Sequence, residues 1–160
     1  MWLSSTAQQA VYAVLCIAQS ERDEPVRVDE IAKIMGSPRN YLSKTLHHLT
    51  RAGVLRSERG PRGGFRLALP PERTTLAKVV APFEPAVKRR CLVGRATCSD
   101  ARPCPAHHRW KEIAATVDDF FSKTTIADLL DDKSNASADA HWLKDSIRNP
   151  NRRSSHGSAA

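Results

Sequence analysis

The sequence predicts a mainly α-helical fold with a small β-hairpin, and three observations support this prediction. Apolar residues recur at helical spacing in several stretches of residues 1–85 and again in residues 106–132. A Gly-Ser-Pro turn at residues 36–38 separates two of the expected helices. Two short stretches with strand-like composition flank the glycine-rich residues 58–64. A chain of 160 residues supports one domain with an appendage.

The first elements read as a helix-turn-helix. Apolar stripes predict helices over about residues 6–20 and 29–35, and Gly36 stands where a helix commonly ends on glycine. Ser37 followed by Pro38 is typical of a helix start, with Ser37 as the N-cap. The next helix reaches about Ala52. Its predicted inward residues are Tyr41, Leu42, Leu46 and Leu49.

A hairpin follows directly, with strands expected at 54–57 and 65–69, so the motif is a winged helix-turn-helix over residues 1–85. A short helix there carries Leu76, Val79 and Val80. We assign residues 86–105 to a cysteine loop and residues 106–132 to a long helix with a short terminal helix. Residues 133–160 are rich in Ser, Asn, Ala and Arg and predict a disordered tail.

The charge distribution is consistent with a nucleic-acid partner. The chain has a net charge of +8, and residues 36–66 hold seven Arg or Lys against one acid, Glu58. Such a basic segment suits a polyphosphate backbone, although a merely solvated basic face stays open as an alternative.

A recognition helix reads bases through its N-terminal residues, and arginine or asparagine can bind guanine or adenine edges. The turn of the wing adds two arginines. The second of them lies between glycines, which permit a close backbone approach, and an arginine at a wing tip suits a narrow minor groove. The predicted contacts to double-stranded DNA are Arg39, Asn40, Ser43, Lys44, His47, Arg59, Arg62, Gly63 and Gly64.

The long helix carries an apolar stripe outside the expected core. Its members are Trp110, Ile113, Val117, Phe120 and Phe121. The stripe either packs on its own chain or pairs with a second subunit. We favour a dimerisation helix, because a protein that reads duplex DNA with one helix generally uses two copies.

Three cysteines lie within fourteen residues, at Cys91, Cys98 and Cys104, and His107 follows three residues later. Thiolates and imidazoles bind soft and borderline metals. The intervals are longer than those of most structural zinc sites and suit a polynuclear cluster, while spacing alone leaves zinc open. His107 either completes the site or caps the helix that it begins, and His108 competes for that role. Cys16, on the apolar stripe of the first helix, reads as a small buried hydrophobe.

Other classes of protein find little support. The apolar run 10–18 is too short to span a bilayer and lacks a basic segment before it, so we expect a cytoplasmic protein with reduced thiols. No nucleophile–base pair, phosphate loop or paired-carboxylate pattern indicates an enzyme or a small-molecule substrate.

Several of these motifs together resemble a known family. The wing run 58–67, the preceding Arg51-Ala52-Gly53-Val54-Leu55, the three-cysteine loop and the closing run 124–129 are similar to the IscR/NsrR-type regulators. These regulators are bacterial winged-helix transcription factors of the Rrf-two family. The similarity spans about residues 1–132.

The resemblance implies a homodimer, paired through its long helix, that binds a palindromic or near-palindromic operator, as a repressor. It also implies an iron–sulfur cluster on Cys91, Cys98 and Cys104, of two-iron two-sulfur or four-iron four-sulfur type, which senses nitric oxide, redox state or cluster supply. His107 occupies the position of the fourth ligand in the IscR branch. Gln8 stands where the NsrR branch has a ligating aspartate, and the first cysteine interval has six residues instead of five. Ser43 replaces an acidic base-reading residue of the IscR branch.

Two alternatives remain. The cysteines could form disulfides on oxidation in a cluster-free thiol switch. The chain could also be a zinc-stabilised interaction protein that docks on another protein.

Overall fold

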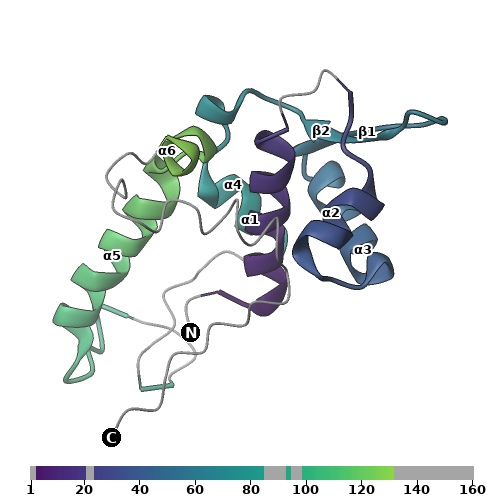
Figure 1. The fold of residues 1–160 in the computed structure, drawn as a ribbon. Helices are drawn as coiled ribbons and strands as arrows, with labels where there is room; N and C mark the ends of the chain where they lie inside the picture. The colour runs from purple at the N-terminus through teal and green to yellow at the C-terminus, as the bar shows by residue number, and fades with distance from the viewer. Residues whose placement is uncertain (1–2, 21–23, 85–92, 95–98, 132–160) are drawn as a thin grey trace, which may run out of the picture.

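The computed structural model describes residues 3–20, 24–84, 93–94 and 99–131, and helix α1 (Ser5–Ala18) lies at the centre of the fold (Figure 1). This helix buries one side with small residues, including Ala7, Ala10 and Ala13, so neighbouring helices can approach closely. The helices that pack against it are α2 (Val28–Met35), α3 (Arg39–Arg51), α4 (Leu76–Val80) and α6 (Ile126–Leu130).

The turn of the helix-turn-helix forms as predicted at Gly36 but not at Ser37. Gly36 adopts φ 57°, and the Ser37 amide donates to the Ala32 carbonyl at 3.0 Å, which closes the end of α2. The residue that caps α3 is Pro38, and no side chain caps that helix. The prediction that Ser37 is the N-cap is therefore wrong, because its backbone belongs to the turn that ends α2.

Helix α3 buries fewer of its apolar residues than the sequence predicts. Leu42, Leu46 and Leu49 are fully buried, as expected, whereas Tyr41 is 40% exposed. The Tyr41 hydroxyl shares a 2.6 Å hydrogen bond with the Thr6 hydroxyl on α1. Tyr41 thus joins the two helices from the surface, and the prediction that it points into the core is wrong.

The wing is a two-stranded antiparallel sheet of β1 (Leu55–Glu58) and β2 (Gly64–Leu67), which confirms the predicted fold class. Phe65 also forms a β-bridge with Val26, with N–O distances of 2.8 and 2.9 Å. A Cβ added at Gly64 would lie 2.5 Å from the Val26 carbonyl oxygen. Glycine at this position therefore lets the wing lie against the segment before α2.

The C-terminal elements join the same core. After the short helix η1 (Pro71–Arg73) and α4, the helix α5 (His107–Lys123) leads to α6. The Ile126 amide donates to the Thr74 carbonyl at 2.8 Å, and the fully buried Ile126 belongs to the core cluster of α1 and α3. Residues 74–76 and 124–126 thus fasten the end of α5 to the winged domain, and the domain boundaries proposed from the sequence stay predictions.

Every helix in the described ranges is too short or too polar to cross a membrane. The predicted tail, residues 133–160, lies outside the described residues. So do residues 86–92 and 95–98 of the predicted cysteine loop.

Candidate nucleic-acid interface and candidate metal centre

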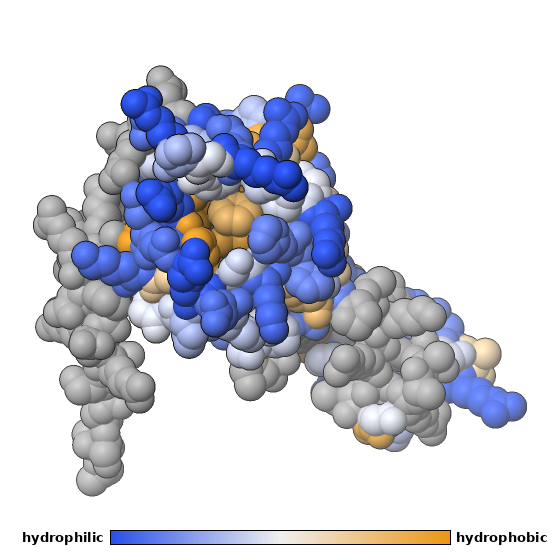
Figure 2. Space-filling model, turned by 90° about the vertical axis from the view of Figure 1, so that its right-hand side faces the viewer, coloured by the Kyte–Doolittle hydropathy of each residue, from blue (hydrophilic) through white to orange (hydrophobic). Residues whose placement is uncertain are grey.

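The predicted recognition residues of α3 share one face of the helix. Leu42, Leu46 and Leu49 occupy the buried face, and the residues between them point outward. Figure 2 views the side of the molecule that bears α2, α3 and the wing, and most of the side chains there are hydrophilic. The exposed members of the set are Arg39, Asn40, Lys44 and His47, and Ser43 is half-buried.

Arg39 has a protein partner that the sequence did not indicate. Its Nε lies 2.5 Å from Oδ1 of Asp29 in the first turn of α2, and both side chains are more than half exposed. The ion pair is too solvated to stabilise the fold by much. Its effect is to hold the Arg39 guanidinium beside the start of α2.

The wing presents its arginines to solvent. Arg59 is exposed, the Arg62 side chain is 88% exposed, and a carboxylate oxygen of Glu24 lies 3.9 Å from the Arg62 guanidinium. His47 on α3 packs edge-on against Phe65 of β2, with ring centroids 5.7 Å apart. This contact fixes the wing relative to α3, so both can present side chains toward one partner.

Gly63 and Gly64 have an internal role. A Cβ added at Gly63 would lie 2.4 Å from the Glu58 carbonyl oxygen, as the one at Gly64 would crowd Val26. Gly63 is therefore required by the hairpin and Gly64 by its contact with the segment before α2, and their contact with DNA stays a prediction.

Two of the four predicted metal ligands lie in the described part of the chain, on one turn. Cys104 is 7% exposed and His107 is 3% exposed, and the His107 amide donates to the Cys104 carbonyl at 2.9 Å. Cys91 and Cys98 lie outside the described residues. His108, the competing histidine, is exposed. Burial therefore favours His107 over His108 as a ligand.

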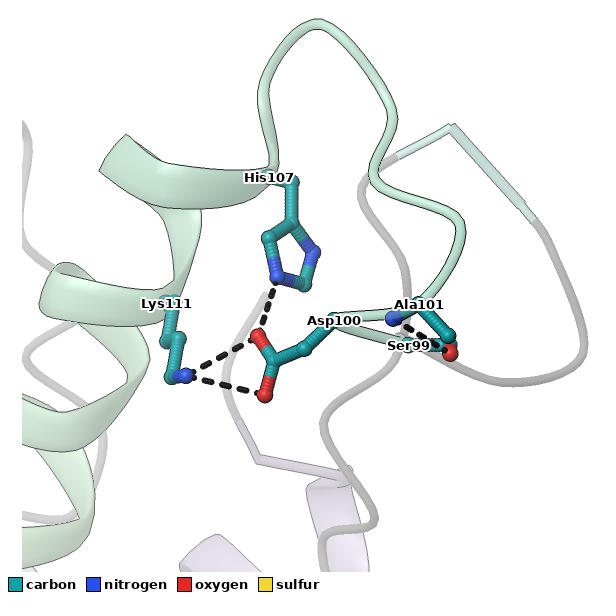
Figure 3. A network of polar contacts seen from close by, with 5 residues as sticks. All are labelled: Ser99, Asp100, Ala101, His107 and Lys111. Atoms are coloured by element: carbon teal, nitrogen blue, oxygen red, sulfur yellow. Dashed lines mark hydrogen bonds and ion pairs between the residues drawn. The ribbon is translucent and has the colours of Figure 1, made fainter.

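A carboxylate contacts the His107 ring, and a lysine contacts that carboxylate (Figure 3). Nε2 of His107 lies 2.7 Å from Oδ1 of Asp100, and Nζ of Lys111 donates to both Asp100 oxygens at 2.9 and 3.0 Å. The hydrogen bond with His107, and then the contacts with Lys111, lower the pKa of Asp100 to about 2. Asp100 is thus a carboxylate at neutral pH. The sequence does not indicate this network: Lys111 lies one turn after His107, but no pattern in the sequence pairs Asp100 with either residue.

The residues present fit an iron–sulfur group. A buried imidazole bound to a carboxylate is the usual arrangement of a metal-ligating histidine, and Cys104 supplies a soft sulfur ligand on the same turn. Within the described ranges no three His, Cys, Asp or Glu side chains gather in a way that could hold a metal ion. The other two predicted ligands, Cys91 and Cys98, lie outside the described residues.

Cys16 plays no part in this chemistry. It is 5% exposed in the core, as predicted, and burial raises the pKa of its thiol to about 12. The reactive thiolate is therefore scarce there at neutral pH.

Helix α5 exposes much of its apolar stripe. Ile113 is 50% exposed and Phe120 is 53% exposed, while Phe121 packs against the core. Beside the start of the helix is an open hollow of about 540 Å³, lined in part by Trp110 and Ile113. Ile113 and Phe120 are thus left uncovered by the described residues of their own chain, whereas Trp110 and Val117 are half-buried.

Comparison with known proteins identifies relatives of the same kind. The model of the Rrf2 family, described as an iron-dependent transcriptional regulator, matches residues 3–132. A protein of Aquifex aeolicus (strain VF5), named as an HTH-type transcriptional regulator, is 41% identical over 133 residues, which are 81% of this chain and 92% of the relative. The HTH-type transcriptional regulator IscR of Vibrio campbellii is 29% identical over 132 residues, which are 82% of this chain and 79% of the relative.

Solved structures share the fold. CymR of B. subtilis, the global cysteine regulator, matches with a TM-score of 0.70 and 20% identity, over 81% of this chain and 95% of CymR. IscR of T. potens matches with a TM-score of 0.66 and 24% identity, over 86% of this chain and 91% of IscR. With the family match and the Aquifex relative, these findings show that the chain belongs to the Rrf2 family of DNA-binding transcriptional regulators and is not an enzyme.

Proposed function

We propose that this chain is a cytoplasmic, homodimeric repressor whose affinity for its operator is controlled by an iron–sulfur cluster. The ligands are Cys91, Cys98, Cys104 and His107. The observation that carries the proposal is the burial of His107 against Asp100, on the turn that also holds Cys104. When bound, such a cluster supplies a centre that reacts with oxidants or nitric oxide.

The chain's own residues provide a connection between this site and DNA. His107 is the first residue of α5, which packs on α4, and α4 packs on α1 beside α3. A change in how the cysteine loop sits on α5 would alter how α5 is held. If α5 pairs two subunits, a change in the position of α5 would also change the distance between the α3 helices of the two subunits.

DNA reading is assigned to the outward face of α3 and to the wing. Arg39, Asn40, Ser43, Lys44 and His47 would enter a major groove, and Arg59 and Arg62 would reach an adjacent groove. Arg39 is the first residue of α3, where base contacts are made, and its guanidinium lies beside Asp29 in the first turn of α2. Gly63 and Gly64 would let the wing backbone approach the phosphates.

The dimer is assigned to the exposed stripe of α5. Trp110, Ile113, Val117 and Phe120 follow one another at intervals of three, four and three residues, which is the spacing of a helix–helix seam. Exposed apolar residues in such a row mark a protein interface more often than a free surface. Two copies would place two α3 helices on successive turns of one duplex, about 34 Å apart.

Replacing Ile113 and Phe120 together with glutamate is expected to give a monomer. Each substitution would bury a charge in the seam and cost about 2 kcal/mol or more of association free energy. Sedimentation equilibrium measures the mass. The control variant carries Ala115→Glu and Ser122→Glu, which add the same charges on the opposite face of α5. The assignment is refuted if the wild-type protein is monomeric, or if both variants stay dimeric.

A thiol switch is the second candidate, because CymR, a cysteine regulator by its title, shares the fold, and a structure of Staphylococcus aureus CymR is of an oxidized form. In this reading Cys91, Cys98 and Cys104 form disulfides, and no cluster is present.

Anaerobic purification separates the candidates. The proposal predicts a coloured protein with visible charge-transfer bands and matching contents of iron and acid-labile sulfide. A colourless protein after anaerobic reconstitution contradicts it. A mass loss of two hydrogens on oxidation would then identify the thiol switch, and stoichiometric zinc would identify a zinc-stabilised protein.

A further inference from the structure

The network around His107 has a feature that metal ligation by itself does not require. Asp100 comes from the cysteine loop, between Cys98 and Cys104, while His107 and Lys111 lie one turn apart on the same side of α5. The Asp100 carboxylate therefore joins the loop to the helix (Figure 3). Ser99 steadies the loop, because its hydroxyl accepts the Ala101 amide at 3.2 Å.

The hydrogen bond has a consequence for the imidazole. A carboxylate only accepts, so the bond of 2.7 Å requires the hydrogen on Nε2 of His107. A neutral ring with hydrogen on Nε2 carries its lone pair on Nδ1. Lys111 binds both Asp100 oxygens, which orients the carboxylate and keeps it charged.

We propose that Asp100, steadied by Lys111, is a positioning residue that fixes the tautomer of His107 and so selects Nδ1 as the nitrogen that ligates the cluster. This inference rests on the proposed function, since it assigns the atom and the supporting residues of the same site. The same contacts of Asp100 hold the cysteine loop against the first turns of α5. Losing the carboxylate would free the ring to turn or to exchange tautomers.

Two measurements test the proposal, and the first needs no cluster. In the apo protein, nitrogen-15 NMR of His107 at a pH where the ring is neutral should show hydrogen on Nε2. Asp100→Ala should give a mixture of tautomers. A wild-type ring with hydrogen on Nδ1, or a tautomer unchanged in Asp100→Ala, overturns the proposal whatever cluster the protein holds.

The second measurement uses the anaerobically reconstituted protein with nitrogen-15 placed selectively in the histidine ring. Pulsed electron paramagnetic resonance of the reduced cluster should show strong coupling to Nδ1. Asp100→Ala is expected to lose iron to a chelator about 10- to 100-fold more readily than wild type, in line with other outer-shell substitutions. Asp100→Asn, which keeps an acceptor oxygen but loses the charge, should lie between the two.

A matched pair on the same helix serves as the control. Asp119 accepts a hydrogen bond from Lys123 at 2.5 Å on α5, and no histidine contacts it within the described part of the chain, so Asp119→Ala should leave the coupling and the iron loss unchanged. Coupling to Nε2, or equal iron loss in Asp100→Ala and Asp119→Ala, rejects the positioning role. If the wild-type protein binds no cluster, the proposed function fails and the ligation proposal fails with it, while the NMR result still reports on the tautomer.

Discussion

Replacing Arg39 and Arg59 together with alanine is expected to weaken operator binding by about 2–6 kcal/mol, or ~30-fold to ~10⁴-fold, because each arginine contributes about 1–3 kcal/mol if it contacts a base. Arg39 lies at the start of α3, and Arg59 directly follows β1 in the turn of the wing. Fluorescence anisotropy measures the effect, with a duplex selected by the wild-type protein from a random library. The salt concentration must be fixed, since phosphate contacts make affinity salt-dependent.

The control removes two positive charges from another part of the protein. Arg73→Ala with Lys123→Ala changes exposed residues of η1 and α5. This variant should lose much less affinity, because only the long-range charge effect changes. If both double variants lose the same operator affinity, Arg39 and Arg59 contribute only through the net charge of the protein and not through specific contacts. A further comparison with Asp29→Ala separates Arg39 itself from its orientation, since only the ion pair is lost there.

Replacing Cys104 with alanine is expected to abolish the cluster. The remaining ligands, Cys91, Cys98 and His107, would leave one coordination position of an iron atom open. Visible absorption and iron content after anaerobic reconstitution measure the loss, which should be nearly complete.

Cys16→Ala is the matched control, because it makes the same change at a buried cysteine outside the site. That variant should keep wild-type absorption and iron content, with some loss of thermal stability from the core. A Cys104→Ala protein that reconstitutes with full iron and unchanged bands is incompatible with the proposed ligand set.

Local patterns predicted most of the fold. The buried leucines of α3 follow the helical period, Gly36 adopts the positive φ that a helix end needs, and the wing strands pair where alternation placed them. The error at Tyr41 arises because its hydroxyl finds a partner, Thr6, at the surface, and the error at Ser37 arises where two local rules compete. Ser37 could start α3 or end α2, and its amide does the latter.

The site was less accessible from the sequence. Cysteine spacing and the helix N-terminus indicated Cys104, His107 and Arg39. Their partners Asp100 and Asp29 come from a loop and from another helix. Hydrophobic periodicity describes residues within one helix or strand, not contacts between two elements. The pairs of His107 with Asp100 and of Arg39 with Asp29 can therefore be recognised only in the three-dimensional structure. The same holds for the attachment of Ile126 to the core.

Operator affinity of the holo and apo forms of one wild-type preparation is the most direct test of the central claim. Both forms should be titrated anaerobically against the same duplex at the same salt concentration. If the cluster controls DNA binding, the two affinities should differ by about 5- to 150-fold, the usual range of coupling between two sites, and the Cys104→Ala protein should keep the affinity of the apo form. Equal affinities of the holo and apo forms would contradict the claim that a cluster at Cys91, Cys98, Cys104 and His107 controls DNA binding.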